Sequence, residues 1–370
     1  MKGMIRSWRG LQWPNAISQK LSRRTFVTEA EVDKARQYCV AQLRQSDYDS
    51  YLIRNFVPKS KRDAYDAFRA LNLELVRLPE LVSNPAIGQL RMQFWRDAIN
   101  NTFVGRPPKE PIMILLSDVL SRLGETSTSS RGSPSSLKFW LFRLLNTRER
   151  HMDNRPFATI NALEDYAENT YATIMYSTLA ALGINSMNMD HLASHIGKAC
   201  GIAAVCRGIP VLSMPSRAVK SPTGADAAPS KHPVLLLPLD VMAETGLKEE
   251  DVYRHGPSAE GFQDAVFKVA TRANDHLITA REMLKRLRNG ESPDHEYEHQ
   301  DEGRHGYPGS DSGPEDIDLA LRKAFCVLLE AVPAKDYLAR LEGADFNPFT
   351  VKNSWKLPLS LWQANRTKQI

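Results

Sequence analysis

The sequence lacks any uninterrupted apolar run long enough to cross a bilayer, which requires about 20 residues in a helix. The run from Val234 to Leu237 is cut short by Pro238 and Asp240. Cysteine is scarce as well: the chain has four, with no CxxC pair and no histidine at zinc-finger spacing from them. These absences argue against a spanning segment and a zinc finger, and give no sign of an oxidising compartment.

Acidic residues are missing from the first 28 residues, although positive ones are frequent there. The six positive residues are Lys2, Arg6, Arg9, Lys20, Arg23 and Arg24. This composition is typical of a mitochondrial presequence, which we assign to residues 1–28; the alternative is a disordered basic tail. Taking these six charges from the net charge of +5 leaves −1 for the rest of the chain. A body that is nearly neutral argues against a nucleic-acid partner, which would require a basic face.

Apolar side chains recur at spacings of three and four along most of the chain, the period of a helix with one buried face. Residues 61–78 follow this pattern up to Pro79, where we expect the helix to end. The same pattern marks residues 87–103, 137–154, 158–182, 190–206 and 262–287. Because no convincing alternating strand pattern is present, the sequence predicts an all-α fold.

Three segments interrupt the helical pattern. Residues 125–136 are rich in serine, residues 213–233 are rich in Pro, Ala and Ser, and residues 289–318 hold ten acids against one Arg. We interpret them as disordered insertions. Helices on both sides are needed to complete one bundle, so we expect a single domain over residues 36–366.

Residues 49–100 open with Asp-Ser-Tyr-Leu-Ile-Arg and continue into a helix that contains Ala67-Phe68. In this frame they resemble the squalene/phytoene synthase family. There, an Asp-rich motif follows the Ala-Phe, and its carboxylates hold the Mg²⁺ that neutralises a diphosphate. Here Leu73 and Arg77 stand where the first and last carboxylates would be, and only Glu74 remains.

Residues 195–208 are similar to the second motif of the same family. Its Gly, Ala and Arg are kept as Gly197, Ala199 and Arg207, whereas its Gln, Asn and two Asp have become Gly201, Ala204, Gly208 and Leu212. The resemblance runs from about residue 47 to residue 362. It implies a single isoprenoid-synthase-like helical bundle around a central cavity. Because the metal ligands are replaced, it also implies a pseudoenzyme with no catalytic residue, no metal and no cofactor.

Two further blocks, Met92-Gln-Phe-Trp95 and Tyr166-Ala-Glu-Asn169, are similar to the non-catalytic mitochondrial branch of this family. That resemblance implies an assembly factor for the membrane arm of respiratory complex I, at the matrix face of the inner mitochondrial membrane. Its partners would be complex I subunits or other assembly factors, with peripheral membrane contact. Two alternatives stay open: an active or residual prenyl-diphosphate transferase, and a protein that binds a lipid or isoprenoid ligand in the old cavity.

Five residues are candidates for the cavity: Asn72, Glu74, Arg77, Tyr166 and Arg207. Arg77 and Arg207 stand where the two motifs of the family meet the diphosphate. Two guanidinium groups facing one cavity would repel each other unless a negative group lay between them. We therefore expect Glu74 to bridge them as part of the scaffold. The alternative is that Arg207 binds an anionic headgroup.

The stretch from Trp355 to Trp362 is a candidate membrane-contact patch, because Leu357, Leu359 and Leu361 alternate around Pro358. The alternative is that this stretch forms a buried cap on the bundle.

Overall fold

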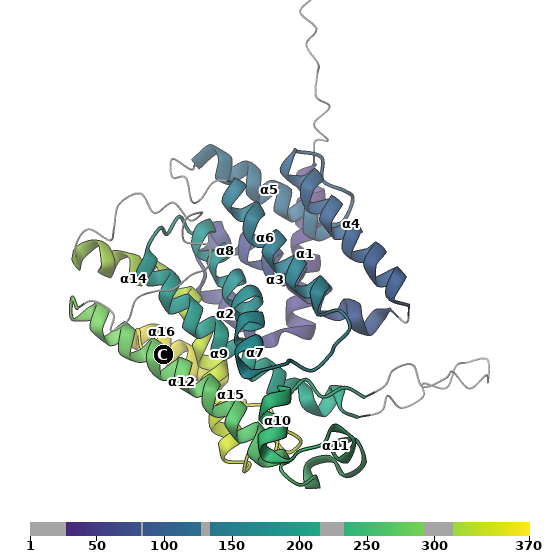
Figure 1. The fold of residues 1–370 in the computed structure, drawn as a ribbon. Coiled ribbons are helices and arrows are strands. Elements are labelled where there is room, and N and C mark those ends of the chain that lie inside the picture. Colours follow the sequence, from purple (N-terminus) through teal and green to yellow (C-terminus); the bar gives the residue numbers. More distant parts are fainter. Residues whose placement is uncertain (1–26, 83, 127–133, 215–232, 292–313) are drawn as a thin grey trace, which may run out of the picture.

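The structure is a computed structural model that describes residues 27–82, 84–126, 134–214, 233–291 and 314–370. Every regular element within those residues is helical (Figure 1), so the all-α prediction is confirmed. The first half contains α1 (Glu29–Ser46), α2 (Tyr48–Ile53), α3 (Arg62–Leu81), α4 (Pro85–Phe103), α5 (Pro111–Thr126), α6 (Pro134–Arg150), α7 (Ile160–Ala167) and α8 (Thr173–Ala181). The second half contains α9 (Met187–Leu212), α10 (Leu239–Thr245), α11 (Glu249–His255), α12 (Phe262–Arg288), α14 (Pro314–Leu328), α15 (Ala331–Glu342) and α16 (Leu357–Thr367).

Helix α9 is the central helix of the bundle and is contacted by α7, α8, α12, α14 and α15. By length and composition it could cross a membrane, although it is no uninterrupted apolar run, because Asp190, Lys198 and Arg207 lie within it. Most of its apolar residues, from Met189 to Ile209, are buried against these neighbours. A core helix surrounded by other helices is apolar for that reason, and α9 is such a helix.

Two clusters of buried apolar residues make up the core. One is built around α9, α12, α14 and α15, and the other around α1, α3, α4, α5 and α6. In Figure 1 the helices of the second cluster lie at the top and right, and α12, α14 and α16 lie at the lower left. The facing helices α3 and α9 therefore belong to different clusters, and polar side chains collect between them.

Two helices differ from the sequence prediction. Helix α3 continues past Pro79 to Leu81, so the proline lies inside its last turn rather than at its end. The helix expected over residues 158–182 is divided into α7 and α8 by a π-helical turn at Glu168–Ala172. An inserted residue in such a turn shifts the face that the following side chains present.

The domain begins earlier than expected, and two of the insertions are shorter. Helix α1 begins at Glu29, where Thr28 and Glu31 form a capping box, and it packs against α3 and α5. The domain therefore begins before residue 36. The edges of two expected insertions are helical, since α6 begins at Pro134 and α14 begins at Pro314. The interiors of the three insertions and residues 1–26 lie outside the described part of the chain.

Candidate functional site

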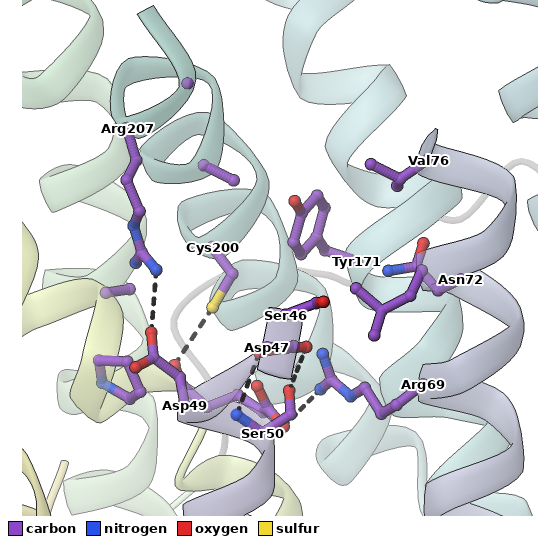
Figure 2. Close-up of a pocket in the computed structure, with 16 residues that line it drawn as sticks. Ser46, Asp47, Asp49, Ser50, Arg69, Asn72, Val76, Tyr171, Cys200 and Arg207 are labelled. Carbon is purple, nitrogen blue, oxygen red and sulfur yellow. Dashed lines mark hydrogen bonds and ion pairs between the residues drawn. The ribbon is translucent and has the colours of Figure 1, made fainter. Parts of the chain in front are cut away.

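A cavity of about 320 Å³ lies between α3 and α9. Helix α3 contributes Arg69, Asn72, Leu73 and Val76, and α9 contributes Cys200, Ala204, Arg207 and Gly208. Within each helix these residues recur at spacings of three and four, which places them on one stripe. Figure 2 shows Arg207 and Cys200 facing Asn72 and Arg69 across the cavity, with the α1–α2 junction between the two sides in the lower part of the view.

The polar positions of the two family motifs face this cavity without polar side chains. Leu73, Ala204 and Gly208 all line it, at positions where the family resemblance places a carboxylate, an amide and a second carboxylate. The two stretches of sequence therefore meet across one cavity, as their alignment requires. At these positions the cavity is lined by the isobutyl group of Leu73, the methyl group of Ala204 and the backbone of Gly208.

Gly201, at the position of the family's glutamine, is used for helix packing. A Cβ atom at Gly201 would lie 2.4 Å from the Cβ of Ala167, and one at Gly197 would lie 2.4 Å from the Cα of Ala172. Real Cβ atoms essentially never approach so closely. The two glycines thus let α7 and the π-helical turn lie directly against α9, and position 201 has no room for a side chain.

The deepest polar feature of the cavity is an ion pair between Arg69 and Glu330, both of which are buried. The hydroxyl of Tyr65 donates to Glu330 Oε1 at 2.9 Å, and the thiol of Cys200 donates to the Glu330 carbonyl oxygen at 3.2 Å. Burial raises the pKa of the Glu330 carboxyl, and the charge of Arg69 opposes that rise. This cluster ties α3 and α9 to the turn before α15.

A second ion pair lies at the mouth of the cavity. Arg207 Nη1 is 2.9 Å from Asp49 Oδ2, and the guanidinium lies over the ring of Tyr337 at 5.1 Å from its centroid. The Arg207 side chain is 48% exposed. It also lines a second cavity of about 750 Å³, which we call the outer cavity; the cavity between α3 and α9 is called the inner cavity, and Arg207 lines both.

The carboxylates that line the inner cavity are all engaged. Glu330 pairs with Arg69, Asp49 pairs with Arg207, and Asp47 accepts from the backbone N–H and the hydroxyl of Ser50 at 3.1 and 2.6 Å. Within the described residues no group of three or more His, Cys, Asp or Glu side chains is placed to hold a metal ion. The donor set therefore does not fit Mg²⁺ bridging to a diphosphate, which needs carboxylates that are free to coordinate.

Of the five predicted site residues, Asn72 and Arg207 line the inner cavity. The expectation that Glu74 bridges Arg77 and Arg207 is wrong. Glu74 accepts a hydrogen bond from the Tyr38 hydroxyl at 3.3 Å, and Arg207 pairs with Asp49. Successive helix residues differ by about 100° in direction, so when Leu73 faces the cavity Glu74 faces α1.

Arg77 and Tyr166 do not themselves line the inner cavity. Arg77 reaches across to α1, where it donates to Gln42 Oε1 at 2.9 Å and to Ser46. Tyr166 accepts from Arg148, which also donates to Asn72 Oδ1 at 2.8 Å. These contacts join neighbouring helices, and they reach the wall of the cavity only through Ser46 and Asn72, which line it.

Tyr171 is the tyrosine that lines the cavity. It lies in the π-helical turn at Glu168–Ala172, one turn beyond Tyr166, and burial raises its pKa. The turn is held by Glu168, whose carboxylate accepts from the hydroxyls of Tyr176 at 2.6 Å and Ser194 at 2.7 Å. The family resemblance had indicated Tyr166, and the local sequence contains no signal for the extra residue of the π-helical turn.

Comparison with known proteins gives a family and a fold. The model of the squalene/phytoene synthase family matches residues 43–363. A solved dehydrosqualene synthase has the same fold, with a TM-score of 0.59 and 14% sequence identity over 92% of this chain and 98% of the other.

Proteins with higher sequence identity to this chain than the solved synthase are named as assembly factors. A rat protein named NADH dehydrogenase (ubiquinone) complex I, assembly factor 6 is 31% identical over 328 residues, which is 88% of this chain and 80% of the rat protein. The mouse protein of the same name is 29% identical over 357 residues, 96% of this chain and 88% of the mouse protein. These similarities extend over both motifs and most of the bundle.

Proposed function

Since the chain belongs to the squalene/phytoene synthase family, we propose that it is a non-catalytic member that supports assembly of mitochondrial respiratory complex I. The observation that carries this proposal is the similarity to complex I assembly factor 6 along 88% of the chain, combined with apolar residues at the motif positions of the cavity. Membership of the family accounts for the helical bundle, and the altered cavity distinguishes this chain from the synthases.

The cavity supports the absence of synthase activity on electrostatic grounds. A prenyl diphosphate needs divalent cations held by free carboxylates to neutralise its charge. Leu73, Ala204 and Gly208 provide none, and the nearby Asp49 and Glu330 are committed to arginines. An unneutralised diphosphate placed here would meet carboxylates without a metal between them, which is repulsive.

We propose that the protein acts at the matrix face of the inner mitochondrial membrane, on intermediates of the membrane arm. Complex I subunits or other assembly factors would be its partners. The acid-free, basic composition of residues 1–28 supports import into the matrix. A reporter fused behind residues 1–35 should be imported and processed, and a reporter that stays in the cytosol would count against this location.

Two experiments test the proposed function. In cells that lack this protein, re-expression of the full chain should restore assembled complex I on native gels. Purified protein incubated with Mg²⁺ and farnesyl or geranylgeranyl diphosphate should give no coupled product, with an active squalene synthase as the positive control. Failure to restore complex I would refute the assembly role, and robust turnover would refute the non-catalytic reading.

A second candidate function is that the cavity binds a lipid or isoprenoid. It is favoured by the position of Arg207, which is half exposed between the inner and outer cavities. On this alternative Arg207→Ala would leave protein level unchanged but abolish complex I assembly, and an apolar ligand would be extracted from the purified wild type. If the cavity holds no ligand, Arg207→Ala should support assembly at the normal level.

A further inference from the structure

Helix α16 has one buried face and one exposed apolar face. Leu357, Leu361 and Ala364 are buried in the core, so the expectation of a C-terminal cap is correct for that face. On the opposite side Leu359 is 62% exposed and Trp362 is 51% exposed, and Trp355, just before the helix, is 83% exposed. Leu359, Trp362 and Arg366 recur at helical spacing, so they form one stripe along the helix.

Every charged side chain within residues 346–370 is basic. From residue 346 to residue 370 the sequence contains Lys352, Lys356, Arg366 and Lys368 and no Asp or Glu. Two of these cations lie against the exposed tryptophans: Lys356 Nζ is 5.7 Å from the Trp355 ring centroid, and Arg366 Cζ is 5.3 Å from that of Trp362. Each indole is thus covered on one side by a positive group.

We infer that this face, which we call the α16 surface (Trp355, Leu359, Trp362, Lys356 and Arg366), docks on the anionic headgroups of a lipid bilayer. The inference rests on the proposed membrane association and names the part of the molecule that makes it. Trp has an apolar body and one polar N–H, which suits the boundary between headgroups and acyl chains. Each Lys or Arg near an anionic membrane surface adds about 1 kcal/mol of attraction.

The number of apolar groups fits reversible, peripheral binding. Three exposed apolar side chains reach only the headgroup and upper acyl region, while the buried face of α16 stays in the protein core. The basic residues therefore supply a large part of the attraction, and the surface selects negatively charged lipid over neutral lipid.

A second exposed apolar stripe provides a matched control. On α4, Ile87 is 46% exposed, Leu90 is 70% exposed and Phe94 is 47% exposed, also at helical spacing. This helix has no exposed Trp, and its charges are mixed: Arg91 and Asp97 are both exposed, and Arg96 pairs with Glu149 at 2.6 Å. A stripe of similar apolar size that is flanked by charges of both signs should favour an anionic membrane less than a stripe flanked by basic residues alone.

The test is flotation of the purified full chain with vesicles. Wild type should float with phosphatidylcholine vesicles that contain about 20 mol% cardiolipin, and should bind pure phosphatidylcholine at least about tenfold more weakly. The triple change Trp355→Ser, Leu359→Ser and Trp362→Ser should reduce binding to anionic vesicles at least about tenfold. The pair Lys356→Glu and Arg366→Glu should reduce it comparably, and the triple change Ile87→Ser, Leu90→Ser and Phe94→Ser should not.

Circular dichroism and thermal melting check that each variant is folded, which is expected because every changed side chain is exposed. The inference is overturned if folded wild type ignores anionic vesicles, if the α4 variant loses binding and the α16 variant keeps it, or if the α16 surface instead mediates a dimer in solution. Complementation separates this result from the proposed function. If wild type restores complex I but does not bind vesicles, only the inference about the α16 surface is refuted. If it binds vesicles but does not restore complex I, only the proposed assembly role is refuted.

Discussion

Glu330→Gln is expected to destabilise the fold more than a change at either arginine of the cavity. Glu330 is buried, pairs with Arg69 and accepts a hydrogen bond from Tyr65 at 2.9 Å. Gln keeps the size of the side chain and removes the charge. Arg69 would then remain as a buried cation without its counterion, and a guanidinium cannot lose its proton in a protein.

The expected loss of stability is large because the buried guanidinium cannot become neutral. Removing one partner of a buried ion pair costs about 3–5 kcal/mol, because the other charge stays buried and uncompensated. A typical domain is stable by only about 5–15 kcal/mol, so this single change removes a large share of the stability. Arg69→Gln should cost less, because the Glu330 carboxyl that remains can take up a proton, and burial already raises its pKa.

The assay is urea denaturation of wild type, Glu330→Gln and Arg69→Gln at several pH values. With its pKa raised in the folded state, Glu330 binds a proton more readily folded than unfolded. The cost of Arg69→Gln should therefore be largest at high pH and shrink as pH falls toward the folded-state pKa. The loss of stability caused by Glu330→Gln should not shrink in this way at low pH, because Arg69 stays charged. Equal costs with no pH dependence, or a Glu330→Gln protein within about 1 kcal/mol of wild type, would refute the reasoning.

Three further predictions concern single positions. Gly201→Gln should destabilise the fold by several kcal/mol, because its Cβ would lie 2.4 Å from Ala167. Gly208→Asp should be tolerated, because only Leu212 Cδ1 lies near its Cβ, at 3.6 Å. Thermal melting of both variants tests this difference. Arg207→Ala should cost at most about 1 kcal/mol in urea denaturation, because its ion pair is half exposed and screened; a loss of about 3 kcal/mol would show that this pair is structural. Burial would raise the pKa of Glu164, but its hydrogen bonds to His and Arg side chains of α12 hold that pKa at about 2. Its stabilisation of about 3 kcal/mol is present above pH 4.5 and lost toward pH 2, so the stability gap between wild type and Glu164→Gln should close over that range.

Much of the fold could be predicted from local sequence. Apolar residues at spacings of three and four give the helices of residues 87–103 and 262–287 to within two residues of α4 and α12. Pro79 shows where local rules stop: it lies in the last turn of α3, where the helix continues to Leu81. The π-helical turn was missed because its extra residue is fixed by buried partners of Glu168 on other segments.

The sequence by itself determined that the metal-binding motifs have lost their ligands, because that loss is a matter of residue identity: Leu73, Ala204 and Gly208 cannot coordinate a cation wherever they lie. Only the tertiary structure decided which charges pair. Glu74 was the acid expected to bridge Arg77 and Arg207, but a helix turns about 100° per residue, so the Glu74 side chain points toward α1. Arg207 pairs with Asp49 instead, and Arg69 pairs with Glu330; both acids are far away along the chain. Ion pairs depend on distance in space, and that distance is fixed only when α3, α9 and the turn before α15 pack together.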